Sequence, residues 1–220
     1  MTRYLAGRGN FTINEVNCLL MKHFIRNTIF HYSSMITVAY DLERFPPGKQ
    51  VACNEIDGGR FIARQIHMLD PVMENELEKA VARMDFSPPF TLEEARKRLA
   101  GGHYFSVVEN ENQIIGWSWA GVGKVFFGEF NCMVELKQRH AFSFNTYIDK
   151  EFRGKGLNQL VLNQQLLCLK KDGFKKVWAL IHVYNKASLR SYLKNGWLEI
   201  GRYRFLRICF LDFKFPPEGI

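Results

Sequence analysis

The stretch Ile148-Asp149-Lys150-Glu151-Phe152-Arg153-Gly154-Lys155-Gly156-Leu157-Asn158 is the most informative part of this sequence. It follows a segment in which Phe142, Phe144, Thr146 and Ile148 alternate with Ser143, Asn145 and Tyr147, a pattern that predicts a β-strand. It leads into the apolar segment Leu157 to Lys171, which predicts a long helix that ends at Asp172-Gly173. The stretch is therefore a glycine-bearing turn between a strand and the start of a helix.

This turn has the features of an anion-binding site. The first backbone N–H groups of a helix have no partners inside the helix, and the helix dipole favours negative charge there. Gly154 and Gly156 let the backbone approach a phosphate closely, and Arg153 and Lys155 add positive charge. The P-loop pattern GxxxxGK(S/T) is absent, and Gly154-Lys155-Gly156 lacks the third glycine of a dinucleotide fingerprint. Taken alone, the turn is equally compatible with a purely structural role.

A second segment, Asn185-Lys186-Ala187-Ser188-Leu189-Arg190-Ser191-Tyr192-Leu193-Lys194-Asn195-Gly196-Trp197, follows the apolar stretch Val177 to Val183. That stretch predicts a strand buried on both faces, parallel to the first strand and joined to it by a right-handed crossover. A helix from Lys186 to Asn195 then starts at the same sheet edge as the glycine turn. Ser188 and Tyr192 share one face of this helix, which directs Tyr192 toward the same cleft. A core-packed tyrosine and a capping asparagine are the alternative.

The remaining segments predict a sheet with helices around it. Strands are expected at Met35–Leu42, Arg60–Met68, His103–Glu109, Ile114–Ala120, Trp197–Phe205 and Ile208–Phe213, and helices at Val16–Phe30, after the Asp70 cap and after Thr91. The span Gly121 to Arg139 predicts extra strands or a mobile flap. We expect residues 1–52 to form an extension packed on a main domain of residues 53–220.

The bulk composition narrows the class of protein without choosing a function. The chain has 220 residues, of which 47% are hydrophobic and 24% charged, as in ordinary soluble domains. A net charge of +8 favours an anionic ligand, but no zinc-finger spacing or dense basic run indicates nucleic acid. The five cysteines are widely spaced and odd in number, which predicts reduced thiols in a cytoplasmic protein. No signal peptide or bilayer-spanning segment is predicted.

Together the two segments resemble the GNAT superfamily of acyl-CoA-dependent N-acyltransferases. The family's cofactor motif, Arg/Gln-x-x-Gly-x-Gly/Ala after a strand, is matched by Arg153 and Gly156, whereas Asn158 departs from its last position. The family's later segment is matched by Asn185, Ser188, Tyr192, Gly196 and Trp197. The resemblance extends from about Arg60 to Phe213. It implies an α/β (α+β) fold with a mixed, mostly antiparallel central sheet, one parallel strand–helix–strand unit and helices on both faces.

The resemblance also implies roles for particular residues. The backbone of Ile148, Asp149 and Lys150 is expected to pair with a pantetheine arm, and the amides of Arg153, Gly154, Lys155, Gly156, Leu157 and Asn158 to hold a pyrophosphate. Asn185 would bond the pantetheine or help to shape the cleft, and Ser188 would belong to the same cofactor site. Tyr192 would be the general acid for the leaving thiolate. The pairing is chemically reasonable, because a thiol has a pKa of about 8.5 and a tyrosine one of about 10.

The general base is left open by the sequence. The candidates are Asp149, Glu129, Glu135, His140 and His182, with a chain of water molecules as an equal alternative. No cluster of His, Cys or Asp has metal-ligand spacing, so no metal is expected.

The predicted function is transfer of an acetyl group from acetyl-CoA, or of another acyl group from its CoA ester, to a primary amine of an unidentified small molecule or peptide by direct attack in a ternary complex. One alternative is transfer of a longer acyl chain, or of an aminoacyl group from a charged tRNA. The basic charge and the aromatic span Gly121–Arg139 motivate it. The other alternative is a non-catalytic CoA-binding scaffold whose extension contacts a partner. A homodimer is compatible with either.

Overall fold

The computed structural model describes residues 30–46, 53–56, 59–86, 89–127, 132–208 and 211–215. The chain divides into two compact units, one of residues 36–201 and one of residues 1–35 with 202–220. The predicted helix over residues 16–30 lies outside the described part, except for Phe30, which begins a strand. The expected boundary at residue 52 stays a prediction.

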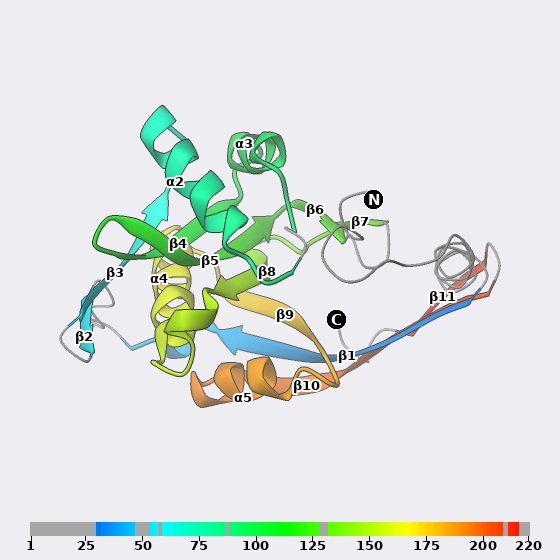
Figure 1. Ribbon diagram of the computed structural model, residues 1–220. Helices are drawn as coiled ribbons and strands as arrows, with labels where there is room; N and C mark the ends of the chain where they lie inside the picture. Colours follow the sequence, from blue (N-terminus) through cyan, green and yellow to red (C-terminus); the bar gives the residue numbers. More distant parts are fainter. Residues whose placement is uncertain are drawn as a thin grey trace, which may run out of the picture. The chain divides into compact units, whose positions relative to one another are not determined.

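A mixed sheet runs through the larger unit in the strand order β1-β9-β8-β5-β4-β3-β2 (Figure 1). These strands are β1 (Phe30–Asp41, of which residues 36–41 belong to this unit), β2 (Cys53–Ile56), β3 (Gly59–Ile66), β4 (Tyr104–Asn110), β5 (Gln113–Val122), β8 (His140–Ile148) and β9 (Lys176–His182). Neighbours from β2 to β8 pair antiparallel, whereas β8 and β9 pair parallel. This arrangement confirms the predicted mixed, mostly antiparallel sheet.

The remaining strands lie outside that set. The hairpin of β6 (Lys124–Phe127) and β7 (Cys132–Glu135) forms a separate two-stranded sheet, which confirms the extra strands predicted there. Short 3-10 turns occur at η3 (Leu42–Arg44) and η5 (Lys150–Phe152). β10 (Leu198–Ile208) pairs antiparallel with β11 (Leu211–Phe215), and both strands begin and end later than the sequence predicted.

The helices begin where capping side chains predict. In α2 (Pro71–Ala82), Asp70 accepts a hydrogen bond from the Met73 amide at 2.8 Å, and Pro71 occupies the first turn. In α3 (Leu92–Ala100), Thr91 accepts from the Glu94 amide at 3.2 Å. The predicted helices in the second half are α4 (Leu157–Lys171) and α5 (Lys186–Lys194).

Two apolar cores lie on opposite faces of the sheet. The first core contains residues of α4, such as Val161 and Leu166, together with inward residues of the strands, such as Ile148. Residues of α2 and α3 form the other, around Trp117 and Trp119 of β5. Figure 1 shows α2 and α3 together on one side of the sheet and α4 on the other. A sheet with both faces covered needs apolar residues on both, which explains the run of buried residues from Ile114 to Ala120 in β5.

A β-bulge interrupts β8 at Asn145. This residue has a φ of 50°, and the register shifts because Trp117 pairs with Tyr147 while Trp119 pairs with Phe144. The extra residue reverses the alternation, so that Ile148 joins the α4 core and Tyr147 joins the α2–α3 core. The strand was predicted correctly, but its unbroken alternation was wrong, because one inserted residue exchanges the two faces.

β8 and β9 are paired along only part of their length. The parallel ladder joins His140–Ser143 to Lys176–Ala179, and the later residues of these two wholly described strands are not paired with each other. Within β9, Val177, Ala179 and Ile181 are buried while the alternate residues are half-buried, so burial of both faces along the whole strand is not observed. The divergence opens the sheet at the edge where α4 and α5 begin.

The close approach of β5 to β8 generates a test of the fold. A Cβ at Gly116 would lie 2.7 Å from the Tyr147 carbonyl oxygen and 2.5 Å from Ile148 Cδ1. We expect Gly116→Ala to lower the free energy of unfolding by about 1–3 kcal/mol, because the backbone of β8 has to move. Thermal unfolding followed by circular dichroism measures this change. An unchanged melting temperature would contradict the packing described for this end of β8.

Candidate functional site

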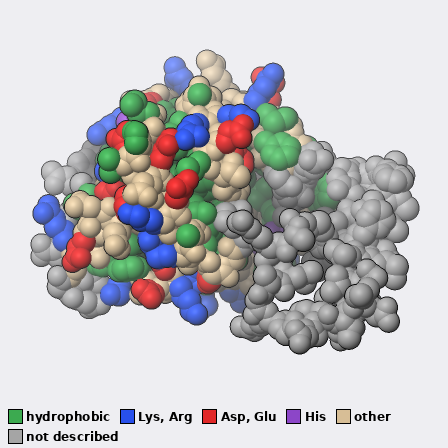
Figure 2. Space-filling view, turned by 45° about the horizontal axis from the view of Figure 1, so that its top comes forward, with side chains coloured by type: hydrophobic (Ala, Val, Ile, Leu, Met, Phe, Trp, Pro, Cys, Tyr) green, Lys and Arg blue, Asp and Glu red, His purple; other side chains and the backbone are tan. Residues whose placement is uncertain are grey.

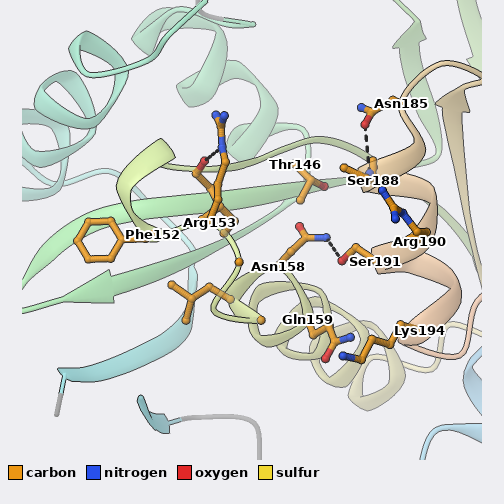
Figure 3. Close-up of a pocket in the computed structure, with 15 residues that line it drawn as sticks. Thr146, Phe152, Arg153, Asn158, Gln159, Asn185, Ser188, Arg190, Ser191 and Lys194 are labelled. Carbon is orange, nitrogen blue, oxygen red and sulfur yellow. Dashed lines mark hydrogen bonds between the residues drawn. The ribbon is translucent and has the colours of Figure 1, made fainter. Parts of the chain in front are cut away.

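A cavity of about 480 Å³ lies where β8 and β9 diverge (Figure 3). The end of β8, the glycine turn, the first turn of α4 and one face of α5 enclose it. Its lining residues are Thr146, Ile148, Phe152, Arg153, Gly154, Gly156, Leu157, Asn158, Gln159, Asn185, Ala187, Ser188, Arg190, Ser191 and Lys194. The two segments singled out in the sequence thus meet around one cavity.

The glycine turn is built for a close ligand. Gly154 and Gly156 have φ values of 85° and 75°, in the left-handed region where glycine carries no steric penalty. A Cβ at either position would find no described atom within 4 Å, so the backbone there faces open space. Gly156 is the N-cap of α4 and offers no side-chain acceptor to the first amides. The Gln159 amide donates to the Gly156 carbonyl at 2.9 Å, which leaves the amides of Leu157 and Asn158 to a ligand at the positive end of the helix dipole.

Arg153 uses its side chain away from the phosphate turn. Its guanidinium donates to both carboxylate oxygens of Asp85 at 3.0 and 3.1 Å, and its Nε donates to the Ile148 carbonyl at 3.0 Å. The guanidinium hydrogen bond lowers the pKa of Asp85. Arg153 therefore fixes the end of β8 to the segment after α2. Lys155 lies 6.0 Å from the ring centres of Phe61 and Phe152.

Besides Arg153, the basic residues that line the cavity come from α5. Ala187, Arg190, Ser191 and Lys194 follow the spacing of one helix face and all line the cavity. Arg190 Nε donates to the Lys186 carbonyl at 3.2 Å, and the side chain is otherwise exposed. Figure 3 shows Arg190 and Lys194 on α5, across the cavity from the glycine turn. Two positive side chains thus face the uncapped start of α4.

Asn158, which departs from the family motif, joins the two helices. Its Nδ2 donates to Ser191 Oγ at 2.7 Å, as Figure 3 shows. The side chain is thereby held beside the cavity, between α4 and α5. Asn185 is the N-cap of α5, because its Oδ1 accepts from the Ser188 amide at 3.1 Å.

Tyr192 is buried behind the cavity wall. It is 3% exposed and packs edge-on against Trp197 at a centroid distance of 4.8 Å. Its hydroxyl lies 3.1 Å from Thr146 Oγ1 and 3.4 Å from Ser143 Oγ. Burial raises the pKa of Tyr192, and the hydrogen bonds with Ser143 and Thr146 oppose that rise. Thr146 lines the cavity and is the point at which the tyrosine hydroxyl reaches it.

None of the four described candidates for the general base lines this cavity. Asp149 is buried and accepts from Arg83 Nε at 3.1 Å. His140 begins β8, at the end away from the cavity, where it accepts from Trp178 Nε1 at 3.1 Å; burial, with Lys176 and Lys137 nearby, lowers its pKa. His182 stacks on Tyr184 at 4.8 Å. Glu135 lies exposed in β7, and Glu129 lies outside the described residues.

Most of the predicted binding residues line the cavity. Among the described residues, the exceptions are Asp149, Lys150, Lys155 and Tyr192. The sequence did not single out Thr146, Phe152, Gln159, Ala187, Arg190, Ser191 or Lys194, which also line it. The α5 stripe could have been found from its helical spacing. The place of Thr146 in the cavity wall could not have been found in this way, because strict alternation assigns Thr146 to the opposite face of β8.

The part of the space-filling surface that is coloured mixes charges of both signs. Figure 2, with the α2 and α3 side turned forward, shows Lys and Arg beside Asp and Glu. The ion pair Arg96–Glu74, at 2.7 Å, joins α3 to α2, and Arg64–Glu109, at 2.7 Å, joins β3 to β4. The positive balance of the chain is therefore not gathered on this face.

The sequence matches the model of the Acetyltransferase (GNAT) family over residues 70–197. This match covers more than half of the chain and includes both the glycine turn and the α5 segment. The chain therefore belongs to the GNAT acetyltransferase family. No curated protein sequence matches it significantly.

Several solved structures share the fold. A GCN5-related glucosamine N-acetyltransferase region of a fungal multi-domain β-N-acetylglucosaminidase has a TM-score of 0.57 at 14% identity, covering 94% of this chain and 23% of that one. A GCN5-related N-acetyltransferase from Sphaerobacter thermophilus has a TM-score of 0.51 at 16% identity, covering 94% and 58%. A tandem GNAT protein of the clavulanic acid biosynthesis pathway has a TM-score of 0.52 at 12% identity, covering 98% and 62%. This chain thus spans less than two-thirds of each, and the likeness establishes the fold.

Two further properties of the described residues concern membranes and metals. No helix in this part of the chain is both long and apolar enough to cross a membrane. His, Cys, Asp and Glu side chains among these residues do not gather in a group of three suited to a metal ion.

The burial of Tyr192 predicts a loss of stability in alkali. Its raised pKa means that the folded state keeps the proton longer than the unfolded state, whose tyrosine ionises near pH 10. The contribution of Tyr192 to the free energy of unfolding is therefore constant below about pH 10 and falls as the pH rises above it. We expect Tyr192→Phe to reduce the slope of this loss, measured as urea unfolding between neutral pH and about pH 11. Parallel slopes for both proteins would contradict the burial of an ionisable phenol at this position.

Proposed function

We propose that this chain transfers an acetyl group from acetyl-CoA to a primary amine, with the pyrophosphate bound at the turn Arg153–Asn158. The observation that carries the proposal is the uncapped start of α4 behind Gly156, facing Arg190 and Lys194 across one cavity. An anion at this point meets free backbone amides from one side and positive side chains from the other.

The residues present suit coenzyme A in particular. The cavity joins a phosphate site to the opening between β8 and β9, so a ligand needs an anionic end and a narrow arm. The backbone of β8 beyond Ser143, which has no partner strand on the β9 side, can hydrogen-bond such an arm as an added strand does. A cavity of about 480 Å³ accepts the pyrophosphate and part of the pantetheine, and the adenosine would lie toward the surface.

The proposed chemistry is direct acyl transfer. The neutral amine attacks the thioester carbonyl carbon, a C–N bond forms, and the C–S bond breaks with its electron pair going to sulfur. The sulfur then takes a proton, and the attacking nitrogen loses one. Since an alkylammonium has a pKa of about 10, it has to lose a proton before it attacks. The hydroxyl pair of Tyr192 and Thr146, of which Thr146 lines the cavity, is proposed to assist the departure of the sulfur.

Binding of the cofactor is the first test. We expect isothermal titration calorimetry of the full chain to show one molecule of acetyl-CoA bound per chain. Absence of binding at about millimolar cofactor would refute the proposal, because substrate constants of enzymes rarely exceed that range. Binding with no release of thiol across a panel of amino sugars, amino acids, polyamines and peptides would favour a non-catalytic CoA-binding protein.

Charge removal on α5 is the second test. We expect Arg190→Ala and Lys194→Ala each to weaken CoA binding by about 3- to 10-fold at low salt, and less at high salt, because exposed charges are screened. Lys186→Ala is the matched control, since Lys186 is exposed on the same helix and does not line the described cavity. An equal effect of all three variants would show a general charge effect and would count against a phosphate site on this face.

A further inference from the structure

Five polar side chains form a buried network behind the cavity, and the roles proposed so far do not use all of them. They are Ser118 of β5, Ser143 and Thr146 of β8, Gln165 of α4 and Tyr192 of α5. Ser118, Ser143, Gln165 and Tyr192 are each at most 3% exposed. Thr146 alone among the five lines the cavity.

The donors and acceptors of this network can be ordered from one end. Gln165 Nε2 donates to Ser118 Oγ at 3.0 Å, which leaves the Ser118 proton for another acceptor. The closer acceptor is Thr146 Oγ1 at 2.9 Å, against 3.5 Å for Ser143. Thr146 therefore accepts a hydrogen bond from the β5 side.

Tyr192 approaches the same oxygen from α5. Its hydroxyl lies 3.1 Å from Thr146 Oγ1. A phenol, with a pKa of about 10, is a stronger acid and a better donor than an aliphatic alcohol, so Tyr192 donates and Thr146 accepts. Burial favours the neutral phenol, which keeps the proton available for this bond.

The hydroxyl proton of Thr146 then remains available for a further hydrogen bond. A threonine hydroxyl has two acceptor lone pairs and one proton. Ser118 and Tyr192 occupy the lone pairs, so the Thr146 O–H is the donor that remains, and the side chain lines the cavity. Two incoming hydrogen bonds polarise this O–H and strengthen it as a donor.

Resting on the proposed function, we propose that Thr146 is the catalytic residue that donates to the departing sulfur, and that Tyr192 is a positioning residue acting through it. As the C–S bond breaks, the electron pair moves to sulfur and the Thr146 O–H hydrogen-bonds the forming thiolate. The Tyr192 proton stays on the buried phenol, and the thiolate leaves as such or takes a proton from solvent. The attacking nitrogen forms the C–N bond and releases its proton to solvent.

A double-mutant cycle tests this order. Turnover is measured as thiol release from acetyl-CoA, with water or an added amine as the nucleophile. We expect Thr146→Val to lower kcat about 10- to 100-fold, the range for loss of a hydrogen bond to a charged group. Thr146→Ser should restore kcat to within about threefold. Tyr192→Phe should cost less than Thr146→Val, and the double variant should be no slower than Thr146→Val alone. Multiplying losses in the double variant would overturn the proposal, because Tyr192 would then act independently.

A binding measurement separates contact with the sulfur from structural damage. Wild type should bind CoA more tightly than desulfo-CoA, which carries hydrogen in place of the thiol, and Thr146→Val should lose this preference. An unchanged preference in Thr146→Val, or none in wild type, would overturn the contact.

The matched control is Thr37→Val, which makes the same change at a threonine that is 2% exposed in β1 and outside the network. It should leave kcat and both affinities unchanged. If wild type binds neither CoA nor desulfo-CoA, the proposed function itself fails. If it binds them and the cycle is multiplicative, only the action of Tyr192 through Thr146 fails.

Discussion

Asn145 holds a left-handed backbone conformation within β8, and the placement of every later residue of that strand depends on it. For a residue with a side chain this conformation costs of the order of 1–2 kcal/mol, although asparagine tolerates it better than most. The cost is offset because the extra residue turns Ile148 into the α4 core and Tyr147 into the α2–α3 core. Without the bulge, Thr146 would face the other side of the sheet, away from Tyr192. The cavity wall, the hydroxyl network and both apolar cores thus share one local constraint.

The divergence of β8 from β9 follows from the same region. The ladder stops at Ser143 and Ala179, just before the bulge, and the backbone after it is left without a partner strand on that side. In a soluble protein such backbone needs hydrogen bonds from solvent or from a ligand. Here it opens next to the start of α4, so an unpaired strand and an uncapped helix are exposed to the same space.

Local sequence patterns predict most of the helices and strands, and the predictions that were wrong have physical causes. Capping residues such as Asp70 and Thr91 act within one turn, so their helices were predicted at the right places. The strand-turn-helix around Gly156 was equally local. The face on which Thr146 lies depends on a register shift against β5, which no short-range pattern reveals. Likewise, the use of Arg153 by Asp85, from a segment far away in the sequence, depends on tertiary packing. The shared helix face of Arg190 and Lys194, in contrast, follows from their spacing of four residues alone.

Arg153 connects the α2 side of the sheet to the rim of the cavity. Its guanidinium is bonded to Asp85, in the segment that follows α2, while its Nε is bonded to the carbonyl of Ile148 at the cavity rim. A ligand that displaces one of these two hydrogen-bond partners therefore strains the hydrogen bond to the other. If a ligand in the cavity displaces the Ile148 carbonyl, the displacement is passed to Asp85 through one guanidinium. By thermodynamic reciprocity, a displacement of Asp85 would change affinity in the cavity by the same factor.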